Sequence, residues 1–177
     1  MSDSPHLLHL YIGDGKGKTS AAMGLALRAL GQGFRVVVAQ FMKNGRSGEL
    51  AALKQLPGAQ VAAVEPIAKF VFRMTPEEKE AARVQQCAQA EALAALAEAE
   101  KPDLLVLDEL ALAMSLGLVS EESGWRLIEA GLRWGEVAVT GRSAPESLLE
   151  RADYVSEVTK RKHPYDKGVQ ARRGIEF

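Results

Sequence analysis

A short stretch near the start of the chain, GDGKGKTS, holds the residues best suited to binding phosphate. Its glycines let backbone N–H groups approach an anion closely, Lys18 supplies a cation, and Thr19 supplies a hydroxyl that can bind magnesium. The usual loop of this kind reads G-x-x-x-x-G-K-[ST], but the position five before Gly17 is Ile12, so this loop is one residue shorter. We therefore expect a triphosphate site whose phosphates lie differently from those of ordinary phosphoryl-transfer enzymes. The candidate nucleotide-binding residues are Gly13, Asp14, Gly15, Lys16, Gly17, Lys18, Thr19 and Ser20.

Two neighbouring acids, Asp108 and Glu109, follow four apolar residues in the stretch DLLVLDEL. A buried parallel strand delivers such acids to the carboxyl edge of its sheet, where nucleotides bind. Carboxylate oxygens suit Mg²⁺, either directly or through water. Together with Thr19, the pair is the predicted metal site, and either carboxylate could be the ligand. The alternative is that the two acids only begin the next loop.

The remaining polar residues do not predict the general base that a kinase or a hydrolase needs. His6 and His9 alternate along the first predicted strand, which favours a structural role for both. His163 lies in the basic stretch KRKHPYDKG, where we expect a solvated side chain.

The elements that must position these residues follow from hydrophobic patterning. Short apolar runs rich in β-branched residues alternate with longer amphipathic ones, which is typical of an α/β fold with a mostly parallel sheet and helices on both faces. The predicted strands cover 7–12, 34–40, 60–64, 103–108, 136–140 and 154–158. The predicted helices cover 18–31, 47–56, 76–100, 121–133 and 145–151. The short loop thus joins a strand to a helix, as a phosphate site requires.

The helix predicted over 76–100 has the clearest start. Thr75, Pro76 and Glu78 combine an N-cap, a proline in the first turn and a capping box. Residues spaced three or four apart predict its buried face, and Cys87 is then core filling. The members of this predicted face are Val84, Cys87, Ala90, Ala94 and Ala97.

Composition limits the class of protein. The 177 residues, 47% of them hydrophobic, suffice for one domain spanning the whole chain. The 22 basic and 23 acidic residues give a formal net charge of -1, so no overall charge favours nucleic acid or membrane surfaces. A single cysteine excludes an intramolecular disulfide. Without a run of about 20 apolar residues or the features of a signal peptide, the sequence predicts a cytoplasmic protein.

Several stretches, in this order along the chain, resemble the P-loop ATP:corrinoid adenosyltransferases. They are GDGKGKTS, AQFMKNGRSGE, VLDEL, VTGR at 139–142 and the closing KHPYDKGVQARRGIEF, and the resemblance extends from Leu10 to Phe177. The family implies a P-loop NTPase-like, RecA-like fold, with ATP and a corrinoid as substrates and Mg²⁺ as a cofactor. Its members transfer the 5′-deoxyadenosyl group of ATP to the Co(I) centre of a reduced corrinoid and release tripolyphosphate.

The resemblance also assigns residues. The family holds the triphosphate as a leaving group, which is a role for Lys16 and Lys18, and Co(I) as the nucleophile needs no general base. Arg28 matches an arginine that contacts the nucleotide in the family, although an ordinary exposed helix arginine is the alternative. Phe70 and Phe72 match an aromatic pair that packs against the lower face of the corrin ring. As catalytic candidates they join Lys18, whereas their alternating spacing alone is more typical of residues in a buried strand.

The resemblance further implies a homodimer. The Co(I) chemistry itself implies a partner that reduces the corrinoid, and we expect a flavoprotein. The few residues before the first predicted strand lead us to expect no covering N-terminal extension. The basic tail between Lys160 and Arg173 is expected to fold back near the nucleotide or a partner subunit. Two other functions remain open: a small-molecule kinase or ATPase, and a nucleotide-dependent module that binds nucleic acid or protein through this tail.

Overall fold

The computed structural model describes residues 5–43, 47–63, 66, 67, 69 and 71–176. Within this part of the chain, six strands form one sheet in the order β3-β2-β4-β5-β1-β6, and every neighbouring pair is parallel. The strands are β1 (Leu8–Ile12), β2 (Val36–Gln40), β3 (Ala59–Val61), β4 (Leu104–Asp108), β5 (Glu136–Thr140) and β6 (Tyr154–Glu157). All six lie where the sequence predicts them, to within a few residues.

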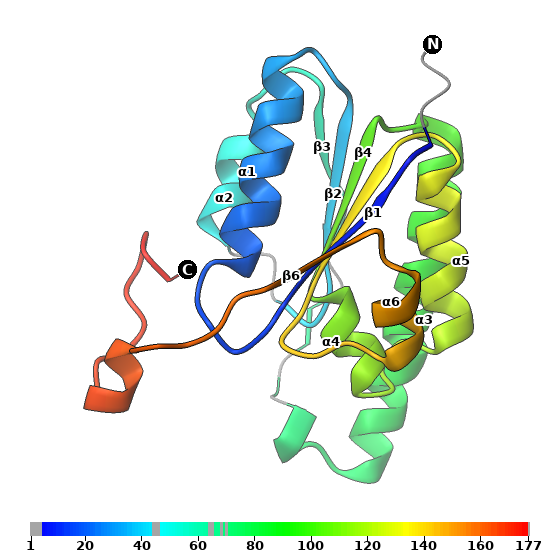
Figure 1. Cartoon of the computed structure of the whole chain (residues 1–177). Coiled ribbons are helices and arrows are strands. Elements are labelled where there is room, and N and C mark those ends of the chain that lie inside the picture. The colour runs from blue at the N-terminus through cyan, green and yellow to red at the C-terminus, as the bar shows by residue number, and fades with distance from the viewer. Residues whose placement is uncertain (1–4, 44–46, 64–65, 68, 70, 177) are drawn as a thin grey trace.

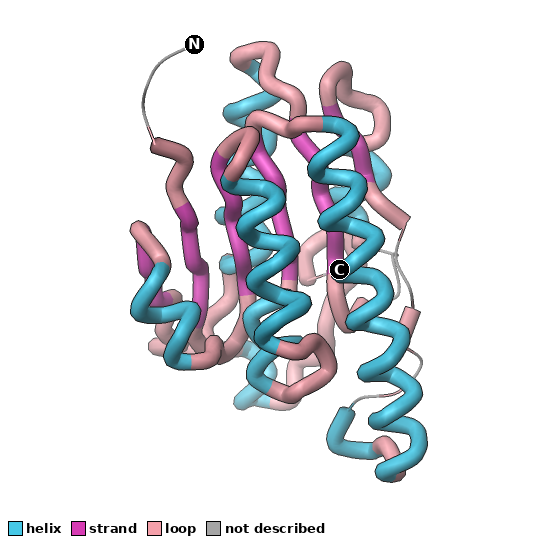
Figure 2. Tube along the Cα trace, turned by 90° about the vertical axis from the view of Figure 1, so that its right-hand side faces the viewer, coloured by secondary structure: helices cyan, strands magenta, loops and turns pink. Residues whose placement is uncertain are grey.

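Helices cover both faces of the sheet, so the α/β prediction is confirmed. Figure 1 shows α1 and α2 on one side of the strands and α3 and α5 on the other, and the turned view in Figure 2 shows the same layers. The helices are α1 (Lys18–Gly31), α2 (Gly48–Leu53), α3 (Pro76–Glu100), α4 (Leu110–Ser115), α5 (Glu121–Leu132) and α6 (Glu146–Arg151). Of these, α4 was not predicted from the sequence. No helix in the described ranges combines the length and the apolar character that crossing a membrane requires.

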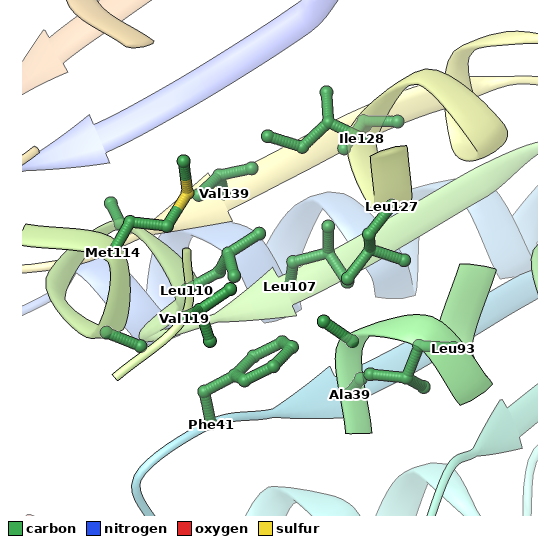
Figure 3. Close-up of a cluster of buried hydrophobic side chains, with 14 of the residues drawn as sticks. Ala39, Phe41, Leu93, Leu107, Leu110, Met114, Val119, Leu127, Ile128 and Val139 are labelled. Carbon is green, nitrogen blue, oxygen red and sulfur yellow. The ribbon is translucent and has the colours of Figure 1, made fainter. Parts of the chain in front are cut away.

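Two apolar cores hold the layers together. The larger lies between the sheet and the α3, α4 and α5 side, where Phe41, Leu107 and Leu110 are fully buried (Figure 3). The smaller lies under α1 and includes Ala22, Ala26 and Val38. Because β2 and β4 are buried along their whole length, the polar groups at their carboxyl ends are held on a rigid edge of the sheet.

Helix α3 begins as predicted, and three members of its predicted buried face, Ala90, Ala94 and Ala97, are buried. The Thr75 hydroxyl accepts the Glu78 N–H, and the Glu78 carboxylate accepts the Thr75 N–H, which completes the capping box. Val84 was predicted to be buried, and this is wrong, because its side chain is 58% exposed. The packed face also contains two buried glutamines, Gln86 and Gln89, which the spacing of apolar residues does not indicate.

Candidate nucleotide-binding site

The glycines of the short loop let it pass close to the C-terminal part of the chain. A Cβ on Gly13 would lie 2.5 Å from the Val158 carbonyl oxygen, and one on Gly15 would lie 2.7 Å from the same atom. Gly13 also has a φ of +111°, which L side chains rarely adopt. The Gly15 N–H donates to Val158 O at 2.7 Å, and the Gly13 N–H donates to Arg142 O at 3.3 Å. These two amides therefore fix the loop.

The backbone N–H groups at the start of α1 have different surroundings from those of Gly13 and Gly15. Gly17 is the N-cap, and no side chain caps this helix. The Ala21 N–H makes the first intrahelical bond, 2.7 Å to Gly17 O. The amides of Lys18, Thr19 and Ser20 therefore lie ahead of the hydrogen-bond ladder, at the positive end of the helix dipole. A free helix N-terminus of this kind is a site for a phosphate group.

Lys18 lies over the loop that precedes it. Its ammonium donates to the Gly15 carbonyl at 2.7 Å. Burial lowers the pKa of Lys18, while the nearby Glu109 carboxylate opposes that change. A partly desolvated ammonium interacts more strongly with an incoming phosphate than one in water, because the local dielectric is lower.

The Asp108 carboxylate, at the end of β4, receives donors from four sides. Its Oδ1 accepts the hydroxyls of Thr19 at 2.8 Å and Thr140 at 2.7 Å. Its Oδ2 accepts the amide of Gln40 at 3.0 Å and the ammonium of Lys43 at 2.5 Å. Since Asp108 is fully buried, this set of donors is what stabilises its charge.

The next residue, Glu109, has a different environment. It adopts a left-handed backbone conformation with a φ of 64°, fixed by a bond from its N–H to the Thr140 hydroxyl at 2.9 Å. Its Oε2 atom is buried and accepts no hydrogen bond from the described residues. Burial and the neighbouring Asp108 charge raise the pKa of Glu109. A buried carboxylate oxygen without a donor among the described residues, in the cleft that Thr19 also lines, suits a hard cation such as Mg²⁺.

The Lys43 side chain belongs to the same site, although it was not among the predicted site residues. Its ammonium lies 2.5 Å from Asp108 Oδ2 and 3.5 Å from the Thr19 hydroxyl. The signal that could have found it is its place in AQFMKNGRSGE, directly after a buried strand. At that point β2 ends beside β4, with Gln40 in register with Asp108.

A cleft of about 980 Å³ opens beside these groups. One end is polar and is formed by the loop, Lys43 and Glu109. The cleft continues between α1 and α2, where Met23, Leu27 and Leu56 line it. The lining is completed by Gly24, Ser47–Glu49, Ala52, Leu53 and the tail residues Gly174–Glu176.

The C-terminal tail lies against the loop, as expected. The Glu176 carboxylate accepts the Lys16 ammonium at 2.9 Å and the Arg172 N–H at 2.8 Å. The Asp14 carboxylate accepts the Lys160 N–H at 2.8 Å, so it is turned toward the tail. Figure 1 shows the tail beside α1 and α2, on the side of the loop.

Other predicted site residues lie outside this cluster. Arg28 is exposed in the last turn of α1, about 15 Å along the helix from Lys18. It follows Leu27 and lies one turn beyond Gly24, two residues that line the cleft. Phe72 is in a 3₁₀ turn, Val71–Arg73, with a side chain that is 80% exposed, which excludes the buried-strand alternative for it. Phe70 lies outside the described residues.

The histidines and the cysteine have structural surroundings. His9 pairs with Glu136 at 2.7 Å and stacks on Tyr154, with 4.6 Å between ring centroids. His163 accepts the Tyr165 N–H at 3.2 Å and so caps the 3₁₀ turn Pro164–Lys167. Cys87 is half-buried on α3, away from the cleft lining.

The comparisons with known proteins cover almost the whole chain. Residues 4–177 match the family described as ATP:corrinoid adenosyltransferase BtuR/CobO/CobP. A corrinoid adenosyltransferase of Pseudomonas aeruginosa is 35% identical over 99% of this chain and 85% of that protein. One from Escherichia coli K12 is 31% identical over 99% of this chain and 87% of that protein. Among solved structures, the flagellar accessory protein FlaH of Methanocaldococcus jannaschii shares the fold, with a TM-score of 0.52 and 15% identity over 86% of this chain and 71% of that one.

Proposed function

Because the chain belongs to the ATP:corrinoid adenosyltransferase family, we propose that it transfers the 5′-deoxyadenosyl group of ATP to the Co(I) centre of a reduced corrinoid. Membership makes it a transferase that uses ATP to adenosylate corrinoids. In the proposed reaction, the electron pair of Co(I) forms a bond to the ribose C5′ of ATP. The C5′–O bond breaks, tripolyphosphate leaves with that bonding pair, and the product is adenosylcobalamin or a precursor of it.

The observation that carries the proposal is the set of positive groups at one end of the cleft. Lys16, Lys18, Lys43 and the first amides of α1 surround the polar end, whereas the rest of the cleft runs between two helices. A leaving tripolyphosphate gains negative charge as the C5′–O bond breaks. Preorganised cations and N–H groups stabilise that charge, and each essential donor accounts for about 3 kcal/mol. The contracted loop thus acts on the leaving group and leaves C5′ open to attack.

Three residues fit a magnesium ion that accompanies the triphosphate. Thr19 offers a hydroxyl, Glu109 offers its unpartnered oxygen, and Asp108 holds Thr19 in place. Mg²⁺ is usually bound by one or two carboxylates together with phosphates and water, so this small set is sufficient. When bound, Mg²⁺ supplies positive charge to the phosphate oxygens of the leaving group.

The family resemblance assigns two phenylalanines to the corrinoid and an arginine to the nucleotide. Phe72 presents an exposed ring next to the Arg73 guanidinium, which lies 5.6 Å from the ring centroid. With Phe70, it would pack against the lower face of the corrin and displace the axial ligand, which makes the cobalt easier to reduce. Arg28 would contact the nucleoside end of ATP from the rim of the cleft.

We further propose that the protein works in the cytoplasm as a homodimer, with a flavoprotein as its electron source. Co(I) is generated only by reduction, so a reducing partner follows from the chemistry. The exposed apolar side chains of the edge strand β6, Tyr154 and Val155, favour contact with a second copy.

An anaerobic assay tests the proposed function. Purified protein, Mg²⁺-ATP and a chemically reduced Co(I) corrinoid are mixed, and the cobalt–carbon bond is followed by visible absorbance while phosphate products are separated. We expect an adenosylated corrinoid and tripolyphosphate, with a rate at least about 100-fold lower in Lys18→Ala. Lys54→Ala, a change at an exposed lysine after α2, is the matched control.

Other products would overturn the proposal. Splitting of ATP to ADP and phosphate without need of a corrinoid would indicate a kinase or an ATPase. Binding of nucleic acid that falls steeply with salt, without corrinoid turnover, would indicate the polyanion-binding alternative.

A further inference from the structure

Lys43 occupies the position where a cation bound by the phosphate loop and β4 would lie. Its ammonium is 2.5 Å from Asp108 Oδ2 and 3.5 Å from Thr19 Oγ1. The lysine side chain is 26% exposed, and the Asp108 side chain is fully buried. The pair is therefore a half-buried ion pair at the polar end of the cleft, beside Lys18 and Glu109.

The backbone around Lys43 is built to aim this side chain. The preceding residue, Met42, has a φ of 56°, a left-handed conformation that is strained for a residue other than glycine. A buried network maintains it: the Met42 N–H donates to Gln86 Oε1 at 3.1 Å. Gln86 donates to Gln89 at 3.1 Å, and Gln89 donates to the Gln40 carbonyl at 2.9 Å. The two α3 glutamines thus tie the end of β2 to a fixed geometry.

Two cations do not share this position. A Mg²⁺ ion held by Thr19 would bind its oxygen ligands at about 2.1 Å. An ammonium that lies 3.5 Å from the same hydroxyl and is paired with Asp108 would then be close to the ion, and the two positive charges would repel each other. The triphosphate, with several negative charges, enters the same end of the cleft. The ammonium then has new anionic partners within reach of its flexible four-carbon stem.

We propose that Lys43 holds the cation position in the ligand-free protein and moves onto the triphosphate when Mg²⁺-ATP binds. This inference deepens the proposed function and rests on it for the identity of the ligand. In the free protein, the lysine neutralises the charge of Asp108 and prevents divalent cations from binding at this position. In the complex, it is a third lysine on the leaving group, beside Lys16 and Lys18, and so a catalytic residue.

The proposal predicts two binding effects of opposite sign for Lys43→Met. Without nucleotide, the variant binds Mn²⁺ about tenfold more tightly than the wild type, because the competing ammonium is gone. With Mg²⁺ present, the variant binds inorganic tripolyphosphate about tenfold more weakly, because one charge-assisted contact is lost. A residue that only supported the fold would not strengthen one ligand while it weakened the other.

The experiment measures Mn²⁺ binding by electron paramagnetic resonance and tripolyphosphate binding by calorimetry. Lys43→Arg keeps the positive charge and should stay near the wild-type Mn²⁺ affinity, and Lys54→Met is the matched surface control. Circular dichroism and the melting temperature establish that each variant is folded. Unchanged affinities, or weaker binding of both ligands by a folded Lys43→Met protein, would overturn the inference.

The test separates this inference from the proposed function, because neither binding measurement needs a corrinoid or turnover. If the wild type adenosylates a corrinoid but the opposite shifts are missing, only the role of Lys43 fails. If the shifts occur while the wild type forms no cobalt–carbon bond, the cation exchange stands and the reaction assignment fails.

Discussion

Asp108 and Glu109 are adjacent in sequence, yet their carboxylates have different hydrogen-bond environments. Asp108 ends a buried strand where four donors converge on it, including the Thr140 hydroxyl. Glu109 turns away in a left-handed conformation and keeps a buried oxygen without a donor among the described residues. Burial raises the pKa of Glu109, with the Asp108 charge as the second cause. The ligand-free protein therefore carries the cost of an unsatisfied carboxylate that a bound cation would relieve.

Glu109→Gln should stabilise the metal-free protein and weaken its binding of Mn²⁺. The expected gain in the free energy of unfolding at neutral pH is roughly 1 kcal/mol, the scale of a desolvated group without its partner. Because the folded pKa is raised, the folded protein binds more protons than the unfolded one between the ordinary and the raised value. The wild type thus loses stability as pH rises through that window, and the variant does not.

Urea unfolding at several pH values, with a chelator present, checks this expectation. Glu100→Gln, at the exposed end of α3, is the control. A gap between variant and wild type that narrowed as pH rose would contradict the assignment of a buried, unpartnered Glu109.

At the scale of elements, local chemistry made much of the fold predictable. The cap at Thr75, the strand before the loop and the acids after β4 depend on neighbouring residues, and the structure has them as expected. The face of α3 was only partly predictable from apolar spacing. Ala90, Ala94 and Ala97 are buried as expected, whereas Val84 is exposed and the buried side also includes Gln86 and Gln89.

The site residues, too, were predictable only where they depend on their neighbours in the sequence. The loop and the acidic pair were found from motifs, because both depend on residues next to one another in the chain. Lys43 was missed because its reach to Asp108 depends on the left-handed turn at Met42 and on a glutamine from α3. Gly13 and Gly15 were expected to serve the anion, but their closest neighbours are the backbone atoms of Val158 and Thr159, just after β6.

The face of α3 can be tested with two substitutions. Val84→Lys should change the free energy of unfolding by no more than about 0.5 kcal/mol, because the site is 58% exposed. Ala90→Leu should destabilise the protein by about 1–3 kcal/mol, because Ala90 is fully buried and the extra atoms overpack the core. Urea unfolding of both variants is the measurement. A large loss in Val84→Lys would restore the face predicted from apolar spacing.

On the scale of the whole molecule, the C-terminal tail packs against the phosphate loop from the other end of the sequence. The Gly15 N–H is bound by Val158, the Asp14 carboxylate by the Lys160 amide, and Lys16 by Glu176. The tail is basic in composition, but the group that it places on the cleft is a carboxylate. Glu176 thus takes a place that a phosphate oxygen would occupy, on a cation of the loop.

Removing the charge of Glu176 should therefore strengthen nucleotide binding. In Glu176→Gln, Lys16 no longer has to break an ion pair before it contacts the phosphates. The dissociation constant for Mg²⁺-ATP should therefore fall by about two- to fivefold, which corresponds to the free energy of an exposed ion pair. The hydrogen bonds from Arg172 and Lys16 hold the pKa of Glu176 well below its usual range. The ion pair therefore contributes at neutral pH and is lost only as pH falls through that lowered value, so the gain in affinity should persist at mildly acidic pH.

Calorimetry at low and at moderate salt measures the effect, which added salt should reduce. Glu150→Gln, on the exposed surface of α6, removes the same charge without touching the cleft. If Glu176→Gln bound Mg²⁺-ATP more weakly than that control, the tail would be part of the binding site itself. Its carboxylate would then orient Lys16 for the phosphates, and closing the C-terminal tail over the loop would be a step in forming the complex.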